Sequence, residues 1–333
     1  MHPLMIDLWT TDALRILLVA FGVGIVVGLT GMGGGALMTP ALIFLGVGST
    51  SAIVTADLTA AAVYKSGGAL VHSKQGSPHF KLAGWLIAGS VPLALLGPHL
   101  VGWFVSADKV ENLLKECIGF ALLLAASTYA IRLYIQLVRV RRGTITHDDD
   151  PRIRPIPTIL VGALGGLLVG VTSVGSGSVI MVVLLILYPT LSPLKLVGTD
   201  LVQAVPLVLA AAISNITVNG LEWSLTVPLI IGSVPGTLLG ARFASRVPQS
   251  VIRRGIVIVL TMSGIALLDK AGWAPLGAGD KQTHPVLIAM IGLGMVVVLP
   301  VVWGFLRRSQ GLPMFGAPTV AELEGSGTVR QDA

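Results

Sequence analysis

Three long stretches of this chain contain no charged side chain, and they constrain its fold more than any other feature. No Asp, Glu, Lys or Arg occurs in residues 16–56, 82–107 or 155–194. Uncharged apolar runs longer than about 18 residues are typical of membrane-spanning helices. The composition agrees, since 53% of the residues are hydrophobic and only 11% are charged. The sequence therefore predicts an all-α polytopic membrane protein.

A glycine-rich motif occurs twice, each time between two apolar segments. Residues 28–35 read GLTGMGGG, and residues 170–178 read GVTSVGSGS. A shift of 142 positions superimposes the two motifs, and one inserted residue then brings Asp57 onto Asp200. Other matched pairs are Gly24 and Gly166, Gly28 and Gly170, residues 90–92 and 233–235 (both SVP), and Gly97 and Gly240. The chain therefore repeats one unit.

The apolar segments divide into five helices in each half and one further helix near the carboxyl end. The first expected helix runs from about residue 13 to the glycine motif. The others are expected at residues 36–47, 49–71, 82–105, 111–138, 158–172, 178–188, 193–218, 224–244, 251–268 and 285–306. The resulting domains are a first membrane repeat (1–138), a basic cytoplasmic linker (139–157), a second membrane repeat (158–268), an extra transmembrane helix (285–308) and a disordered cytoplasmic tail (309–333).

The helix after each glycine motif is short. At about 1.5 Å per residue, the segment 36–47 reaches only about 20 Å, against a hydrocarbon core of about 30 Å. One of its ends should therefore lie inside the bilayer, at the glycine motif. Irregular backbone at that depth needs protein or a water-filled cavity around it. We expect short broken helices in both halves.

The basic residues predict the orientation in the membrane. If every segment crosses the bilayer and the N-terminus lies outside, most Lys and Arg fall in cytoplasmic loops, which is the expected bias. Only Arg15, Lys109, Lys115, Lys270 and Lys281 fall on the outer side. Five crossings per half, an odd number, make the two repeats inverted relative to each other. We therefore expect a protein of the cell membrane whose C-terminus is cytoplasmic.

The remaining composition excludes some partners. The net charge of +6 comes from basic residues scattered over short loops, so we expect a lipid bilayer as partner and no nucleic acid. Cys117 is the single cysteine, which excludes a disulfide within the chain. The six His residues are dispersed, and we expect neither a cofactor nor a metal site. A membrane-embedded enzyme would need clustered His, Asp and Arg.

The glycine motifs are candidate sites for an anion. A helix N-terminus presents unpaired N–H groups and a partial positive charge, and small residues allow a close approach. The alternative is close helix packing through small residues. The candidate substrate-binding residues are Thr30, Gly31, Gly33, Gly34, Gly35, Thr172, Ser173, Gly175, Ser176, Gly177 and Ser178.

Two acidic residues lie inside apolar helices. Asp57 and Asp200 each stand about eight residues into a helix, or about 12 Å from the membrane face. An ionisable group near the midplane is costly and marks a functional site by default. These acids could carry a coupling proton or help to bind Na⁺; alternatively, each is a buried carboxyl paired with a neighbour. Lys65 either attracts the anion or extends toward the inner surface, and Val208 stands at its counterpart.

Several ordered motifs resemble one family. They are GLTGMGGGAL, TADL and GTDL, YKSGGALVH, and GSVPG, and they resemble the TauE/SafE sulfite exporter family over residues 14–268. The resemblance implies a two-repeat permease for sulfite, sulfoacetate or another small organic anion. The expected function is a secondary transporter, an exporter of a small anion coupled to protons or Na⁺. A passive anion channel on the same scaffold is the alternative. The sequence allows an oligomer but does not predict the oligomeric state.

Overall fold

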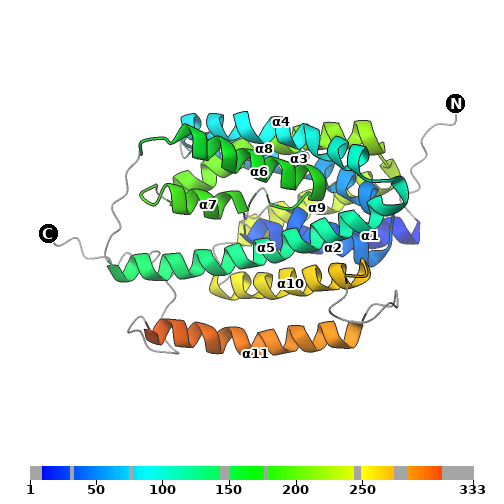
Figure 1. Cartoon of the computed structure of the whole chain (residues 1–333). Coiled ribbons are helices and arrows are strands. Elements are labelled where there is room, and N and C mark those ends of the chain that lie inside the picture. The colour runs from blue at the N-terminus through cyan, green and yellow to red at the C-terminus, as the bar shows by residue number, and fades with distance from the viewer. Residues whose placement is uncertain are drawn as a thin grey trace.

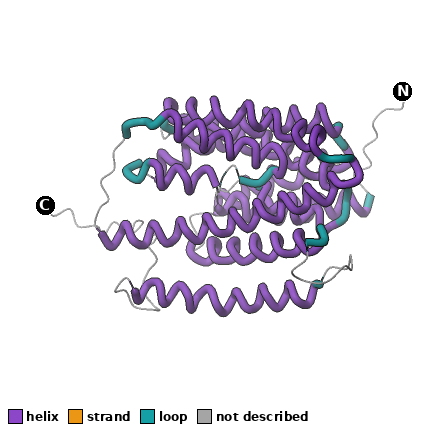
Figure 2. The backbone as a smooth tube through the Cα atoms, viewed as in Figure 1, coloured by secondary structure: helices purple, strands orange, loops and turns teal. Residues whose placement is uncertain are grey.

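The computed structural model is helical throughout its ordered elements, and the described residues contain no strand (Figure 2). It describes residues 10–30, 34–74, 78–142, 151–175, 177, 179–191, 193–243, 249–273 and 284–309. The helices are α1 (Thr11–Thr30), α2 (Gly35–Leu45), α3 (Thr50–Lys74), α4 (Phe80–Phe104), α5 (Ala107–Arg142), α6 (Pro155–Thr172), α7 (Val179–Leu187), α8 (Pro193–Asn219), α9 (Trp223–Phe243), α10 (Gln249–Lys270) and α11 (Pro285–Ser309). Each expected apolar segment is a helix, so the predicted fold class is confirmed.

Seven of the described helices are long and apolar enough to cross a membrane: α1, α4, α5, α6, α8, α9 and α11. By contrast, α2 has 11 residues and α7 has nine. Helices of these lengths extend about 16 and 14 Å, so neither crosses a hydrocarbon core of about 30 Å by itself. The helices α4, α5, α10 and α11 run along one common direction (Figure 1).

The outer surface of the bundle is apolar. Large side chains such as Trp103, Phe104 and Leu164 are 70%, 82% and 71% exposed. On helices long and apolar enough to cross a membrane, exposed apolar side chains of this size are typical of a surface that faces lipid. Together with the long apolar helices, it makes the chain a multi-pass membrane protein.

The two halves of the chain are interleaved. α1 packs along α9, and α4 packs along α6, so the first helix of each half pairs with the fourth helix of the other. The corresponding helices α3 and α8 pack against each other, as do α5 and α10. The two halves therefore share one core. The inversion of one half relative to the other across the membrane stays a prediction.

Matched glycines allow the closest of these contacts. A methyl group on Gly24 of α1 would come within 2.7 Å of the Ser233 carbonyl oxygen on α9. A methyl group on Gly166 of α6 would overlap the Ser90 carbonyl oxygen on α4. These glycines occupy corresponding positions of the two repeats, and both let backbones approach directly. At Gly24 and Gly166, close helix packing explains why the residue is glycine.

The additional helix α11 lies at the edge of the bundle beside α10 (Figure 1). Its start is tied to the end of α10 by His284, whose backbone N–H donates to Asp269 Oδ2 at 2.8 Å. The His284 ring nitrogen Nδ1 also lies 3.0 Å from Asp269 Oδ1. The rest of the predicted tail, residues 310–333, lies outside the described residues.

Candidate functional site

The two glycine motifs meet in the structure. Gly35, the first residue of α2, lies against Ser173, which caps the carboxyl end of α6. A methyl group on Gly35 would overlap the Ser173 carbonyl oxygen, so only glycine fits there. Ser173 itself has a φ of 60°, which turns the chain away from α6. The start of a short helix in one repeat therefore touches the end of a helix in the other.

Asp57 on α3 lies at this junction. Its side chain is fully buried. Its Oδ2 atom accepts hydrogen bonds from Thr39 Oγ1 of α2 at 2.6 Å and from Ser173 Oγ at 2.8 Å. Its Oδ1 atom has no hydrogen-bond partner in the part of the chain that the structure describes. One buried carboxyl group thus links a helix of its own repeat to the turn of the other repeat.

Tyr64, also on α3, contacts the first glycine motif. The backbone N–H of Gly34, the residue that precedes α2, donates to the Tyr64 hydroxyl at 3.0 Å. A methyl group on Gly34 would overlap that hydroxyl. The Tyr64 hydroxyl is also within electrostatic range of Asp57. Tyr64 therefore belongs to the junction, although we did not predict it as a site residue.

Lys65 and Asp200 extend the cluster of charges. Both side chains are buried, and Lys65 interacts electrostatically with Asp200 and with Asp57. This is made possible by the packing of α3 against α8. Asp200 Oδ1 accepts a hydrogen bond from Gln203 Nε2, one turn further along α8, at 3.1 Å. Lys65 is thus buried beside the two acids, and its attraction of an anion stays a prediction.

The other predicted residues of the glycine motifs have structural contacts where they are described. The hydroxyl of Thr30 donates to Val26 O at 2.9 Å. The hydroxyl of Thr172 donates to Leu168 O at 2.6 Å. Gly175 has a φ of 121°, which favours glycine, and Gly177 O accepts a bond from Tyr129 Oη at 3.4 Å. The predicted residues Gly31, Gly33, Ser176 and Ser178 lie outside the described residues.

Thr39 is a second residue of the junction that we did not predict. Its hydroxyl makes the shorter of the two hydrogen bonds to Asp57 Oδ2, yet Thr39 stands in a short apolar helix where threonine is unremarkable. The available signal was the polar side chain one turn after the glycine motif. Tyr64 gave a similar signal, since its hydroxyl lies in an apolar helix directly before Lys65. Neither pattern says which group these hydroxyls contact.

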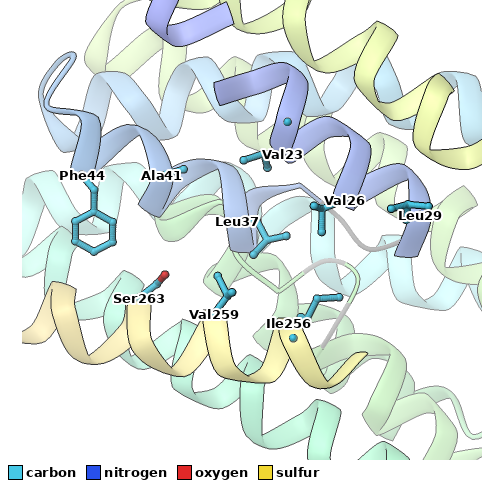
Figure 3. A pocket seen from close by; sticks show the side chains of 11 residues that line it. Val23, Val26, Leu29, Leu37, Ala41, Phe44, Ile256, Val259 and Ser263 are labelled. Atoms are coloured by element: carbon cyan, nitrogen blue, oxygen red, sulfur yellow. The ribbon is translucent and has the colours of Figure 1, made fainter. Parts of the chain in front are cut away.

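A separate pocket lies between α1, α2 and α10 (Figure 3). Its volume is about 480 Å³, and its lining includes Val26, Leu37 and Val259. Apart from Ser263, the side chains that line it are apolar. Such a lining does not compensate the lost hydration of an anion. The junction at Asp57, and not this pocket, is therefore the candidate site.

The junction can attract ions of both signs. The first amides of α2 have no partner within their helix and carry a partial positive charge, which suits an anion. The carboxyl end of α6 carries a partial negative charge. Asp57 stands where the two ends meet. No group of three or more His, Cys, Asp or Glu side chains that could hold a metal ion occurs among the described residues.

A buried ionisable cluster at broken helices, inside a bundle of membrane-spanning helices, defines the architecture of a membrane permease. Comparison with known proteins agrees. The family described as Sulfite exporter TauE/SafE matches residues 16–267. The chain belongs to this family of membrane transporters.

Two relatives from Bacillus subtilis (strain 168) are similar to the chain over most of its length. One is named "Probable membrane transporter protein YjnA" and is 33% identical over 258 residues, which cover 77% of this chain and 100% of the relative. The other is named "Probable membrane transporter protein YdhB" and is 27% identical over 254 residues, or 76% and 99% of the two chains. No solved structure matches the chain.

Proposed function

We propose that the protein is a secondary transporter that exports a small anion, such as sulfite or an organosulfonate, by alternating access between its two repeats. Transport is coupled to a proton or sodium gradient. The substrate class follows from the family description, Sulfite exporter TauE/SafE. Export of an anion is also favoured by a membrane potential that is negative inside, which contributes about 2.3 kcal/mol per charge per 100 mV.

One observation carries the proposal: Asp57 is held from both repeats at once. Thr39 of its own repeat and Ser173 of the other repeat donate to the same carboxylate oxygen. A movement of one repeat against the other would break or lengthen one of these bonds. The charge on Asp57 therefore biases the equilibrium between two arrangements of the repeats, which is the requirement for coupling.

The adjacent start of α2 supplies the anion site in this mechanism. The amide of Gly35, the first residue of α2, would bind the anion, and the buried Lys65 adds a positive charge nearby. Neutralising a carboxylate changes its repulsion of an anion bound beside it, so the cation site and the anion site are linked.

Flux in reconstituted vesicles tests the function. Proteoliposomes that contain the purified protein are loaded with ³⁵S-labelled sulfite or sulfoacetate, and efflux is followed with and without an imposed pH or Na⁺ gradient. We expect one of these anions to move against its own electrochemical gradient when a cation gradient is present. Flux that only dissipates the anion gradient would identify the passive channel instead. Protein-free vesicles give the background.

A further inference from the structure

The buried charges at the junction do not balance. Asp57, Asp200 and Lys65 are all buried, and Lys65 interacts with both acids. When all three are ionised, these three side chains, among the residues that the structure describes, sum to one negative charge. A net charge in a low-dielectric interior is costly unless it is paired. One added positive charge would neutralise the cluster.

The unsatisfied part of the cluster is Asp57 Oδ1. Its Oδ2 accepts two hydroxyl donors, whereas Oδ1 is buried and has no hydrogen-bond partner among the described residues. Asp200, in contrast, is bonded by Gln203. A buried carboxylate oxygen without a donor is unfavourable unless a cation or a proton takes the donor's place. The added charge therefore belongs at Asp57.

The atoms around Asp57 are hard oxygen donors. They are the hydroxyls of Thr39 and Ser173, which touch the carboxylate, and the hydroxyl of Tyr64, which lies within its electrostatic range. Small hard cations prefer oxygen ligands of this kind. The carboxyl end of α6, where Ser173 stands, adds a partial negative charge, and broken-helix transporters bind coupling cations at such ends.

We propose that Asp57, Thr39, Ser173 and Tyr64 form the binding site for one monovalent cation, and that Asp200 is the counter-ion of Lys65. Na⁺ and a proton supply the same charge at this position. The coupling role of this cation rests on the proposed function, but its binding does not. The other repeat has no equivalent set, because Met181 stands at the position of Thr39 and Leu207 at that of Tyr64. The chain therefore has one such site.

Binding to the purified protein in lipid nanodiscs tests this site without any anion. In the first arm, ²²Na⁺ binding is measured by scintillation proximity against choline chloride. In the second arm, Na⁺ is absent, and proton uptake after a small drop in pH is measured with an indicator dye. We expect saturable binding of one cation per chain in one of the two arms, and that arm identifies the ion.

Four variants locate the binding. Asp57→Asn should abolish it. Asp200→Asn should weaken it without abolishing it, because Lys65 then faces Asp57 as its single acid in the cluster. Ser173→Gly, which tolerates the positive φ of that residue, and Thr39→Val should each weaken it about 10-fold, since each removes a hydrogen bond to a charged group. Ser90→Ala is the matched control, because it removes an equally buried hydroxyl from α4 and should leave binding unchanged.

The outcomes separate the site from the proposed function. Equal binding by wild type and Asp57→Asn in both arms overturns the site, as does loss of binding in Asp200→Asn but not in Asp57→Asn. If Asp57→Asn does not fold, unchanged binding by Ser173→Gly and Thr39→Val overturns the site instead. Cation binding that depends on Asp57 in a protein that moves no anion would leave the site intact and refute only the proposed transport.

Discussion

The two acids at matched positions of the repeats have different surroundings. Asp57 accepts hydrogen bonds from Thr39 and from Ser173, and it lies within electrostatic range of Tyr64. Asp200 accepts a hydrogen bond from Gln203 of its own helix. The repeats thus share helix pairing and an acid, but they differ in the groups that contact the acid.

Further matched positions show the same divergence. Lys65 corresponds to Val208, and Gln203 corresponds to Ala60. Helix packing conserves the close backbone contacts on both sides, because α1 against α9 and α4 against α6 need small residues at matched places. Polar side chains are free of that constraint. A duplicated scaffold can therefore hold two chemically distinct halves, one for a cation and one for a counter-ion.

The largest effect is expected from Asp200→Asn. Removing this charge leaves Lys65 without one of its two acids, so coupled flux should fall about 100-fold while the protein still inserts in the membrane. Flux of ³⁵S-labelled anion in proteoliposomes measures it. Asp269→Asn, which changes a half-buried acid at the α10–α11 connection, is the control and should retain flux within about twofold. Wild-type flux in Asp200→Asn would contradict any role of the second acid.

Gly35→Ala tests the contact between the two glycine motifs. The added methyl group overlaps the Ser173 carbonyl oxygen, and overpacking of this kind costs about 1–3 kcal/mol. We expect a lower apparent Tm, followed by tryptophan fluorescence in detergent, together with reduced flux. Gly84→Ala on α4 is the matched control, since its methyl group meets nothing within 4 Å. Equal Tm values for the two variants would mean that the motifs do not pack as described.

Lys65→Met tests the asymmetry of charge. The substitution keeps the length of the side chain but leaves both acids without their shared positive neighbour, so flux should fall about 10-fold, equivalent to about 1.4 kcal/mol. Adding Val208→Lys to this variant places the charge on the other repeat. Restored flux in the double variant would show that the two halves are interchangeable, and it would contradict the claim that they are chemically distinct.

The smallest effect is expected from Tyr64→Phe. It removes one neutral hydrogen bond, from the Gly34 N–H, which is worth about 0.5–1.5 kcal/mol. Cation affinity and flux should each change by less than about 10-fold. Tyr134→Phe is the control, because that tyrosine is exposed on α5. A change no larger than that of the control would remove Tyr64 from the site.

Much of the architecture follows from one-dimensional patterns. Length and apolarity predict each helix, because a segment in lipid must satisfy its backbone hydrogen bonds internally. The predicted boundaries agree with the structure within a few residues; for example, the segment 82–105 is α4, Phe80–Phe104. The duplication of the glycine motif and of the acids is likewise visible in the sequence alone, since it needs only a comparison of the chain with itself.

The tertiary structure alone decided which groups meet. The bond from Ser173 to Asp57 joins residues 116 positions apart, and the Gly34 N–H reaches Tyr64 across 30 positions. Such contacts depend on how the helices pack within a repeat and between the repeats. Helical periodicity specifies which face of a helix is polar without specifying its partner. For this reason the sequence was sufficient to identify a membrane protein with two acids at matched positions. The packing of α2, α3 and α6 was needed to show that these two acids have different surroundings.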